Sequence, residues 1–257
     1  MVIIDKHKFI NDDCLNVLPN IDSKSVDIVV TSPPYNINLK YNTYNDFNKN
    51  YLQWTYDWSE HIYRVLKDNG SFFLNIAGKV SNFILPIQVI NNLSKLFVIQ
   101  NQIIWSKSIY IEKTNHTYGH FKPVNSNKYL NNTHEFIFHL TKNGNTKLNR
   151  LGIGVSYSDK SNSKRWSSKS NTRCLGNVWH IPYVTKKTKD KHPAMFPVEL
   201  PLKCIKLHGY NDSTIVMDIF GGHFNTSIAA KQLKINSISI EKDELYYKTG
   251  IERFNND

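Results

Sequence analysis

The stretch Ser25-Val-Asp-Ile-Val-Val-Thr-Ser-Pro-Pro-Tyr35 indicates a buried strand that ends in a rigid turn. Its apolar run is short and unbroken, which is typical of a strand that is covered on both faces. Prolines cannot continue a central strand because they lack the N–H donor, so the chain must leave the sheet at Pro33 and Pro34. The stretch therefore predicts a sheet with two covered faces and a constrained turn at the end of one strand.

Strands and helices alternate along the rest of the chain. Short apolar runs predict strands at 71–76, 97–105, 135–140, 214–218 and 237–241. Apolar residues at helical spacing predict helices at 51–66, 80–96, 197–207, 226–233 and 243–254, with residues 67–70 as a helix stop. This alternation predicts an α/β fold, in which helices cover both faces of an open, mostly parallel, Rossmann-like sheet.

The composition is that of a globular protein and excludes several other classes. A chain of 257 residues with 40% hydrophobic residues fits one α/β domain that carries an inserted subregion. No apolar run could cross a bilayer, and the first residues lack an apolar signal segment, so we expect a cytoplasmic protein. The three cysteines form no close pair, and His116 and His120 lack a metalloprotease pattern, so we expect no bound metal.

The positive charge is concentrated in one part of the chain. The net charge is +11, and residues 141–192 contain twelve Lys or Arg against two Asp, a local balance of +10. The aromatic residues Tyr157, Trp166 and Trp179 lie within this segment. A solvated basic loop would have this composition, and so would a surface that contacts the phosphates of a nucleic acid.

Two predicted strands end in an acidic residue, Asp218 and Glu241, and a Gly221-Gly222 turn follows the first of them. Ligands of open parallel sheets bind beyond the carboxyl ends of the strands, where glycines allow the backbone to approach closely. A carboxylate at such a strand end can accept hydrogen bonds from ribose hydroxyls. The pattern predicts a pocket for an adenosine-containing cofactor, although a tight packing turn would also use these glycines. The spacing of a phosphate-binding P-loop is absent, which disfavours ATP.

The turn from Thr31 to Tyr35 suits the methylation of an exocyclic amino group. The amino nitrogen is a poor nucleophile because its lone pair is delocalised into the ring, so acceptors must hold its two N–H bonds. The Ser32 hydroxyl and the Pro33 carbonyl can accept them, and the prolines offer no competing donor. Tyr35 can stack on a base that is flipped out of the duplex. Alternatively, the segment is a strand-terminating turn with a buried tyrosine.

The order of these segments resembles that of the β-class amino-methylating DNA methyltransferases of restriction-modification systems. In that family the catalytic Pro-Pro-Tyr turn precedes the target-recognition region, and the cofactor turn lies near the C-terminus. Beside the two turns, the segments that carry the resemblance are Asn11–Leu15, Leu66–Ser71, Ile104–Lys107, His134–Phe138, Gly176–Pro182 and Lys191–Pro197. The likeness covers the chain outside roughly residues 108–133 and 141–175.

The resemblance implies a division of the chain and a set of site residues. Residues 1–140 would be the catalytic half, 141–190 the target-recognition region, and 191–257 the half that binds S-adenosylmethionine. The catalytic turn would consist of Ser32, Pro33, Pro34 and Tyr35. The predicted cofactor-binding residues are Asp13, Thr31, Pro193, Phe196, Asp218, Phe220, Gly221, Gly222, Asn225, Thr226 and Glu241.

Double-stranded DNA is the partner that the resemblance implies, with a homodimer and a companion restriction endonuclease as further possibilities. Four basic residues cluster within ten positions around an indole ring. The predicted DNA-binding residues are Lys164, Arg165, Trp166, Lys169 and Arg173.

The cofactor turn departs from the family pattern. The usual Asp-Pro-Phe-x-Gly-Ser-Gly-Thr-Thr is here Asp218-Ile-Phe-Gly-Gly-His-Phe-Asn-Thr226. Phe224 replaces a glycine and brings a Cβ and a ring to a position where close backbone approach is expected. The departure predicts either weaker cofactor binding or a loop that is built differently.

The sequence leaves the target base and two rival functions open. Cytosine carbon-5 methylation requires a Pro-Cys nucleophile, which is absent. The family tends to pair Ser-Pro-Pro-Tyr with cytosine N4 and Asp-Pro-Pro-Tyr with adenine N6, so Ser32 favours cytosine without excluding adenine. The rival functions are an amino-methyltransferase acting on RNA or protein, and a catalytically silent DNA-binding protein.

Overall fold

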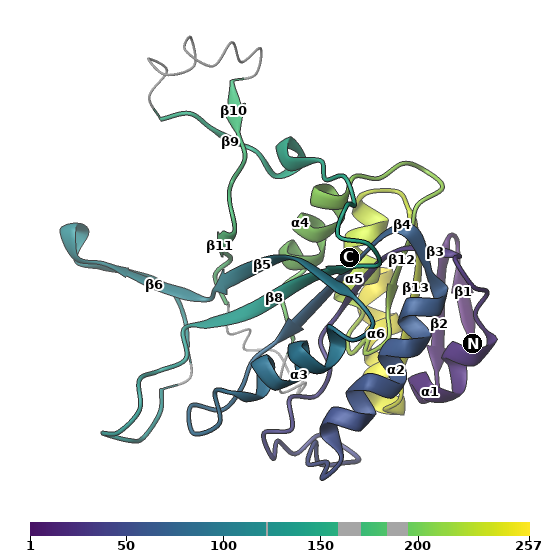
Figure 1. Cartoon of the computed structure of the whole chain (residues 1–257), viewed down its shortest axis with the longest axis horizontal. Coiled ribbons are helices and arrows are strands. Elements are labelled where there is room, and N and C mark those ends of the chain that lie inside the picture. The colour runs from purple at the N-terminus through teal and green to yellow at the C-terminus, as the bar shows by residue number, and fades with distance from the viewer. Residues whose placement is uncertain (122, 159–170, 184–194) are drawn as a thin grey trace.

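A nine-stranded mixed sheet forms the centre of the molecule (Figure 1). The computed structural model describes residues 1–121, 123–158, 171–183 and 195–257. The strand order is β1-β2-β13-β12-β3-β4-β8-β5-β11, and the pairs β1/β2, β4/β8 and β8/β5 are antiparallel. The strand bounds are β1 Val2–Ile4, β2 His7–Asn11, β3 Val26–Thr31, β4 Leu66–Ile76, β5 Val98–Ser106, β8 His134–Thr141, β11 Val178–His180, β12 Ile215–Asp218 and β13 Asn236–Glu241.

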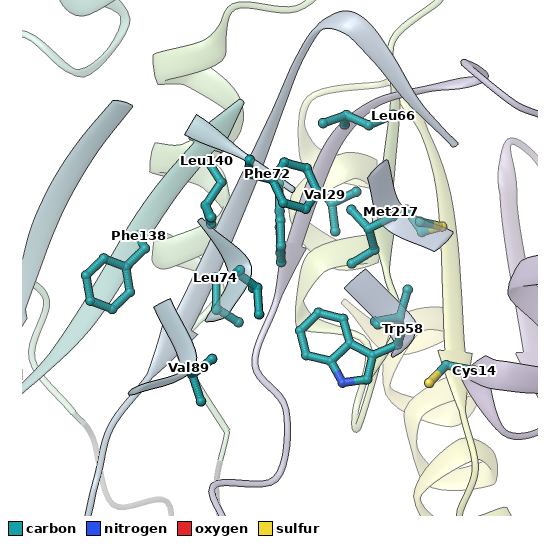
Figure 2. Packing of buried hydrophobic residues seen from close by; sticks show 14 of the residues in the cluster. Cys14, Val29, Trp58, Leu66, Phe72, Leu74, Val89, Phe138, Leu140 and Met217 are labelled. Carbon is teal, nitrogen blue, oxygen red and sulfur yellow. The ribbon is translucent and has the colours of Figure 1, made fainter. Parts of the chain in front are cut away.

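Helices cover both faces of this sheet, as the sequence predicts. The helix bounds are α1 Cys14–Val17, α2 Tyr51–Val65, α3 Leu85–Leu93, α4 Glu199–His208, α5 Asn225–Gln232 and α6 Glu244–Asn256. Successive side chains of β3 point to opposite faces of the sheet. Val29 packs into the cluster with α2 and α3 (Figure 2), whereas Ile28 and Val30 pack against α4 and α5. The unbroken apolar run of β3 is explained by this burial on both faces.

Two small ribbons stand away from the sheet. Strand β6 (Ser108–Ile111) pairs with β7 (His116–Gly119), and this hairpin extends beyond the end of β5 in Figure 1. Strand β9 (Val155–Ser156) pairs with β10 (Thr172–Arg173) within the basic segment. The short 3-10 helices are η1 Leu18–Asn20, η2 Glu112–Thr114 and η3 Arg150–Ile153. Among the described residues, no helix is long and apolar enough to cross a membrane.

The prediction that residues 67–70 end the helix with a glycine cap is wrong. Helix α2 ends at Val65, and the chain enters β4 directly at Leu66, whose backbone is extended. Gly70 does not have a positive φ, so it is not a helix cap. A Cβ on Gly70 would lie 2.7 Å from the Leu66 side chain and 2.9 Å from the Asp27 carbonyl. The glycine is therefore explained by close packing at a register shift between β3 and β4.

A polar group is buried in the sheet at His139 of β8. The imidazole is fully buried, stacks on Phe73, and lies 3.0 Å from Asn101 Nδ2 and 2.9 Å from Ser71 Oγ. Because the asparagine amide donates to Nδ1, Nε2 carries the proton and donates to the serine. Burial lowers the pKa of His139 from 6.5 to about 3, so the folded protein holds it neutral.

We expect His139 to contribute a loss of stability as the pH falls below about 6.5, because the unfolded chain then binds the His139 proton and the folded chain does not. Between pH 7.5 and 5 the loss from this group is on the order of 1–2 kcal/mol of unfolding free energy. Urea unfolding at both pH values measures it. His139→Gln should remove this loss, so the variant should gain that much free energy of unfolding relative to the unmodified protein between pH 7.5 and 5, whereas His116→Gln, at an exposed position, should leave the dependence unchanged. Equal pH dependence in all three proteins would contradict the assignment.

Candidate active site

A cavity of about 600 Å³ opens at the carboxyl edge of the sheet, between the Ser-Pro-Pro-Tyr turn and the Asp218 loop. Strands β3 and β12 are parallel neighbours, with Val216 opposite Ile28, so both loops leave the sheet at the same edge. Residues 32–35 and 219–223 line this one cavity. Its volume lies within the roughly 300–1,000 Å³ that is usual for small-molecule sites. The two turns therefore share a cleft, as methyl transfer between them requires.

Backbone and side-chain contacts fix the catalytic turn. The Tyr51 hydroxyl donates to the Pro34 carbonyl at 2.7 Å. No hydrogen bond from the residues that the structure describes reaches the Pro33 carbonyl. Ser32 Oγ lies 2.8 Å from the Tyr35 hydroxyl. Ser32 and Pro33 both line the cavity.

Asp218 joins the two turns from behind the cavity. Its carboxylate accepts from the Thr31 hydroxyl at 2.6 Å, the Thr226 hydroxyl at 2.7 Å and the Phe220 N–H at 3.1 Å. Burial raises the pKa of Asp218 to about 6, while the three donors oppose the rise. The carboxylate is therefore mostly ionised at neutral pH. Its contacts position the loop, and the cavity wall is formed by Ile219 and its successors.

Glu241, at the end of β13, lines the cavity from the other side of the glycine turn. Its two carboxylate oxygens accept from the Gly222 N–H at 2.8 Å and the Asp243 N–H at 2.7 Å. Burial raises the pKa of Glu241 to about 7 despite these donors. Each oxygen keeps a further lone pair that can accept from a ligand hydroxyl.

The altered cofactor turn is built around the ring of Phe224. This residue has φ 61°, the left-handed conformation that a glycine adopts without strain. Its ring is fully buried against Phe9 and Phe254 and does not line the cavity. Room for the ring comes from Gly250 of α6, where an added Cβ would lie 2.6 Å from it. Phe224, which replaces the glycine of the family pattern, therefore does not obstruct the cavity.

Most of the predicted site residues meet at this cavity. Those that line it are Asp13, Ser32, Pro33, Pro34, Tyr35, Phe196, Phe220, Gly221, Gly222, Asn225 and Glu241. Thr31, Asp218 and Thr226 are buried behind it. Pro193 lies outside the described residues.

The predicted DNA-binding residues fall mostly outside the described residues. Lys164, Arg165, Trp166 and Lys169 belong to that undescribed part. Arg173 lies on β10 and is exposed. Trp179, which the composition places beside the basic residues, is fully buried, and its Nε1 donates to the Gly176 carbonyl at 3.0 Å. Trp179 is thus a core residue and offers no face for a base.

One wall of the cavity is formed by the segment 36–50, which follows the catalytic turn and was not predicted from the sequence. Tyr41 and Tyr44 stack there with ring centroids 4.8 Å apart. The Thr43 hydroxyl donates to Asp243 at 2.7 Å, which ties the segment to the start of α6. The tyrosines are visible in the sequence, but they lack the periodicity by which a helix or strand is recognised.

Comparisons with known proteins agree with this geometry. A family model described as a DNA methylase matches residues 26–252. The Type II methyltransferase M.HpaI of Haemophilus parainfluenzae is 28% identical over 259 residues, 97% of this chain and 74% of its own. The DNA adenine methyltransferase YhdJ of Escherichia coli is 28% identical over 258 residues, 95% of this chain and 81% of its own.

Solved structures share the fold. The PvuII DNA methyltransferase, described as cytosine-N4-specific, superposes with a TM-score of 0.74 at 19% identity, covering 97% of this chain and 86% of its own. The M1.HpyAVI–SAM complex gives 0.64 at 19% identity, covering 97% and 99%.

The chain belongs to the DNA methylase family that groups N6 and N4 methyltransferases. It is an S-adenosylmethionine-dependent enzyme that methylates an amino group of DNA. The predicted α/β fold, family, enzyme class and cofactor are confirmed.

We expect Gly250→Ala to destabilise the protein, although alanine ordinarily stabilises a helix interior relative to glycine by about 1 kcal/mol. The new Cβ would collide with the Phe224 ring and press on the Gly222 carbonyl, 3.2 Å away. Overpacking of this kind typically costs about 1–3 kcal/mol. Urea unfolding measures stability, and calorimetric titration measures S-adenosylmethionine affinity, which should fall as well.

The pairing with Phe224 supplies the control for this substitution. In a Phe224→Leu background the smaller side chain leaves room for the Cβ, so Gly250→Ala should cost much less there. An equal or larger cost in that background would refute the role of the ring.

Proposed function

We propose that this enzyme methylates the N4 amino group of cytosine at a specific site in double-stranded DNA. The observation that carries the proposal is the common cavity of the Ser32–Tyr35 turn and the 219–222 loop. Serine in the catalytic turn favours cytosine by the tendency of the family. Adenine N6 is the second candidate, because the 28% identical relative YhdJ is named a DNA adenine methyltransferase.

The residues around the cavity fit S-adenosylmethionine. Gly221 and Gly222 allow close approach of the backbone, and Glu241 can accept from the ribose hydroxyls. Trp54 and Phe220, with ring centroids 5.4 Å apart, provide an apolar wall. When bound, this cofactor supplies a methyl group on a positively charged sulfur.

We assign the polar part of the chemistry to the catalytic turn. The Pro33 carbonyl and Ser32 Oγ would accept the two N–H bonds of the flipped base and turn its nitrogen lone pair toward the methyl group. The Tyr35 ring would stack on the base. Catalysis then rests on positioning and on fixed dipoles, without a covalent enzyme intermediate.

We further propose that residues 141–190 recognise the target, with residues 1–140 and 191–257 as the catalytic and cofactor halves. The local charge of +10 over residues 141–192 supports contact with phosphates. A companion restriction endonuclease belongs to the same proposal, since M.HpaI is named a Type II methyltransferase. A homodimer is proposed from the resemblance to the family alone.

Incubating the protein with duplex DNA and isotopically labelled S-adenosylmethionine tests the product. Digestion to nucleosides and mass analysis should give N4-methylcytosine. N6-methyladenine would overturn the choice of base and keep the amino-methylation. Transfer to RNA or protein in preference to duplex DNA, or no cofactor heat at millimolar concentration, would support the rival functions instead.

Replacing Lys164, Arg165, Lys169 and Arg173 together by alanine should weaken DNA binding and flatten its salt dependence. Each phosphate that the variant no longer neutralises should lower the slope of log K against log salt by about 0.9. Fluorescence anisotropy from 50 to 200 mM salt measures the slope, and Lys6→Ala with Lys8→Ala, at the β1/β2 edge of the sheet, is the control. An unchanged affinity and slope would show that these four residues do not bind DNA.

A further inference from the structure

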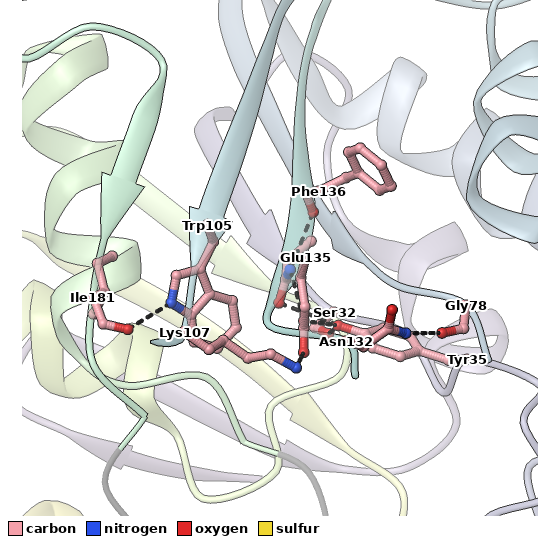
Figure 3. Close-up of polar contacts among 10 residues, drawn as sticks. Ser32, Tyr35, Gly78, Trp105, Lys107, Asn132, Glu135, Phe136 and Ile181 are labelled. Atoms are coloured by element: carbon pink, nitrogen blue, oxygen red, sulfur yellow. Dashed lines mark hydrogen bonds and ion pairs between the residues drawn. The ribbon is translucent and has the colours of Figure 1, made fainter. Parts of the chain in front are cut away.

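Glu135 lies at the start of β8, beside the catalytic turn (Figure 3). Its Oε2 lies 2.8 Å from the Tyr35 hydroxyl and 3.1 Å from Asn75 Nδ2, and its Oε1 lies 3.0 Å from Lys107 Nζ. The lysine and glutamate side chains are only 18% and 13% exposed. These two residues fall in the segments Ile104–Lys107 and His134–Phe138, for which the sequence predicts no role.

The donors and acceptors of this cluster have one consistent arrangement. The Tyr35 hydroxyl lies 2.8 Å from Glu135 Oε2 and 3.2 Å from Asn75 Oδ1. A carboxylate only accepts and is the nearer partner, so the hydroxyl donates its single proton to Glu135 Oε2. Asn75 Nδ2 faces two acceptors, Glu135 Oε2 and the Phe136 carbonyl at 3.1 Å, which fixes the orientation of that amide. Tyr35 has no second proton for Ser32. The Ser32 hydroxyl must therefore donate to the tyrosine oxygen across the 2.8 Å contact.

This direction decides what Ser32 offers to the cavity. Once its proton points at Tyr35, Ser32 Oγ has only lone pairs left for a ligand. An exocyclic amino group presents N–H donors, so a pure acceptor is the partner it needs. A serine whose proton pointed into the cavity would instead place its O–H donor against the N–H donors of the amino group.

We propose that Glu135, held by Lys107, is a positioning residue that makes Ser32 Oγ an obligatory acceptor through the Tyr35 hydroxyl. The inference rests on the proposed amino-methylation and applies equally to cytosine and adenine. The same contacts fix the Tyr35 ring by its hydroxyl, so one carboxylate orients both the acceptor and the stacking face.

Glu135→Gln keeps the shape of the side chain and reverses the chain of hydrogen bonds. Lys107 favours the amide oxygen on its side, so the amide nitrogen faces Tyr35 and donates to it. The tyrosine proton can then turn toward Ser32, whose own proton turns toward the cavity. We expect the single-turnover methylation rate to fall about 10- to 100-fold. This is less than the roughly 100- to 1,000-fold loss on removing one oriented group at a reacting atom, because Ser32 Oγ itself stays in place.

Tyr35→Phe removes the hydroxyl that links Glu135 to Ser32. This variant tests the proposal if Glu135→Gln is poorly folded. The rate should fall by a similar factor, and the double variant should lose no more than the slower single variant. The dissociation constants for S-adenosylmethionine and for DNA should stay within twofold of those of the unmodified enzyme. The urea midpoint should be unchanged within experimental error. Glu112→Gln, at an exposed carboxylate of η2, is the matched control and should keep the full rate.

The outcomes separate this inference from the proposed function. If the unmodified enzyme transfers no methyl group to DNA, the proposed function fails. If it is active and Glu135→Gln or Tyr35→Phe retains its rate, the positioning role is refuted. A double variant whose rate falls by the product of the two single losses would also refute it. So would a rate loss that is fully explained by a lower urea midpoint.

Discussion

The carboxylate of Asp218 is the contact on which the site depends. It lies under the meeting point of two strands that are far apart in sequence, and it accepts a hydrogen bond from Thr31 on one and from Thr226 beyond the other. Burial of a carboxylate destabilises the folded state, and each hydrogen bond to a charged group stabilises it by roughly 1.5–3 kcal/mol. The three donors keep the group ionised at neutral pH, and in doing so they hold the methyl-donor loop and the catalytic turn at a fixed separation.

A second constraint comes from volume. The loop that follows Asp218 needs one left-handed residue, and this chain places an aromatic residue there. The conformation is strained for phenylalanine, but its ring fills a space beside Phe9 that two glycines, Gly221 and Gly250 of α6, leave open. The loop thus exchanges the freedom of a glycine for hydrophobic burial. This explains how a turn that departs from the family pattern still bounds an open cavity.

The polar cluster around Glu135 links the outer strands of the sheet to the chemistry. Strands β5 and β8 contribute no residue to the catalytic turn, yet their ends bring Lys107 and Glu135 to the tyrosine hydroxyl. The antiparallel strand β8 is what makes this possible, because its first residues lie at the edge where the parallel strands end. The carboxylate therefore enters the site from the opposite chain direction.

The sequence by itself determined the alternation of strands and helices, the two turns and the family, because these depend on local periodicity and on residue types at short spacing. Confirmed examples are β3, predicted from its apolar run, and α6, predicted from helical spacing after Glu241. Only the tertiary structure decided the direction in which the Phe224 ring points, the burial of Trp179, the wall formed by residues 36–50 and the contact of Glu135 with Tyr35. Each of these depends on distances between residues that are far apart in sequence, and such distances are set by strand order and packing, which leave no periodic trace in the chain.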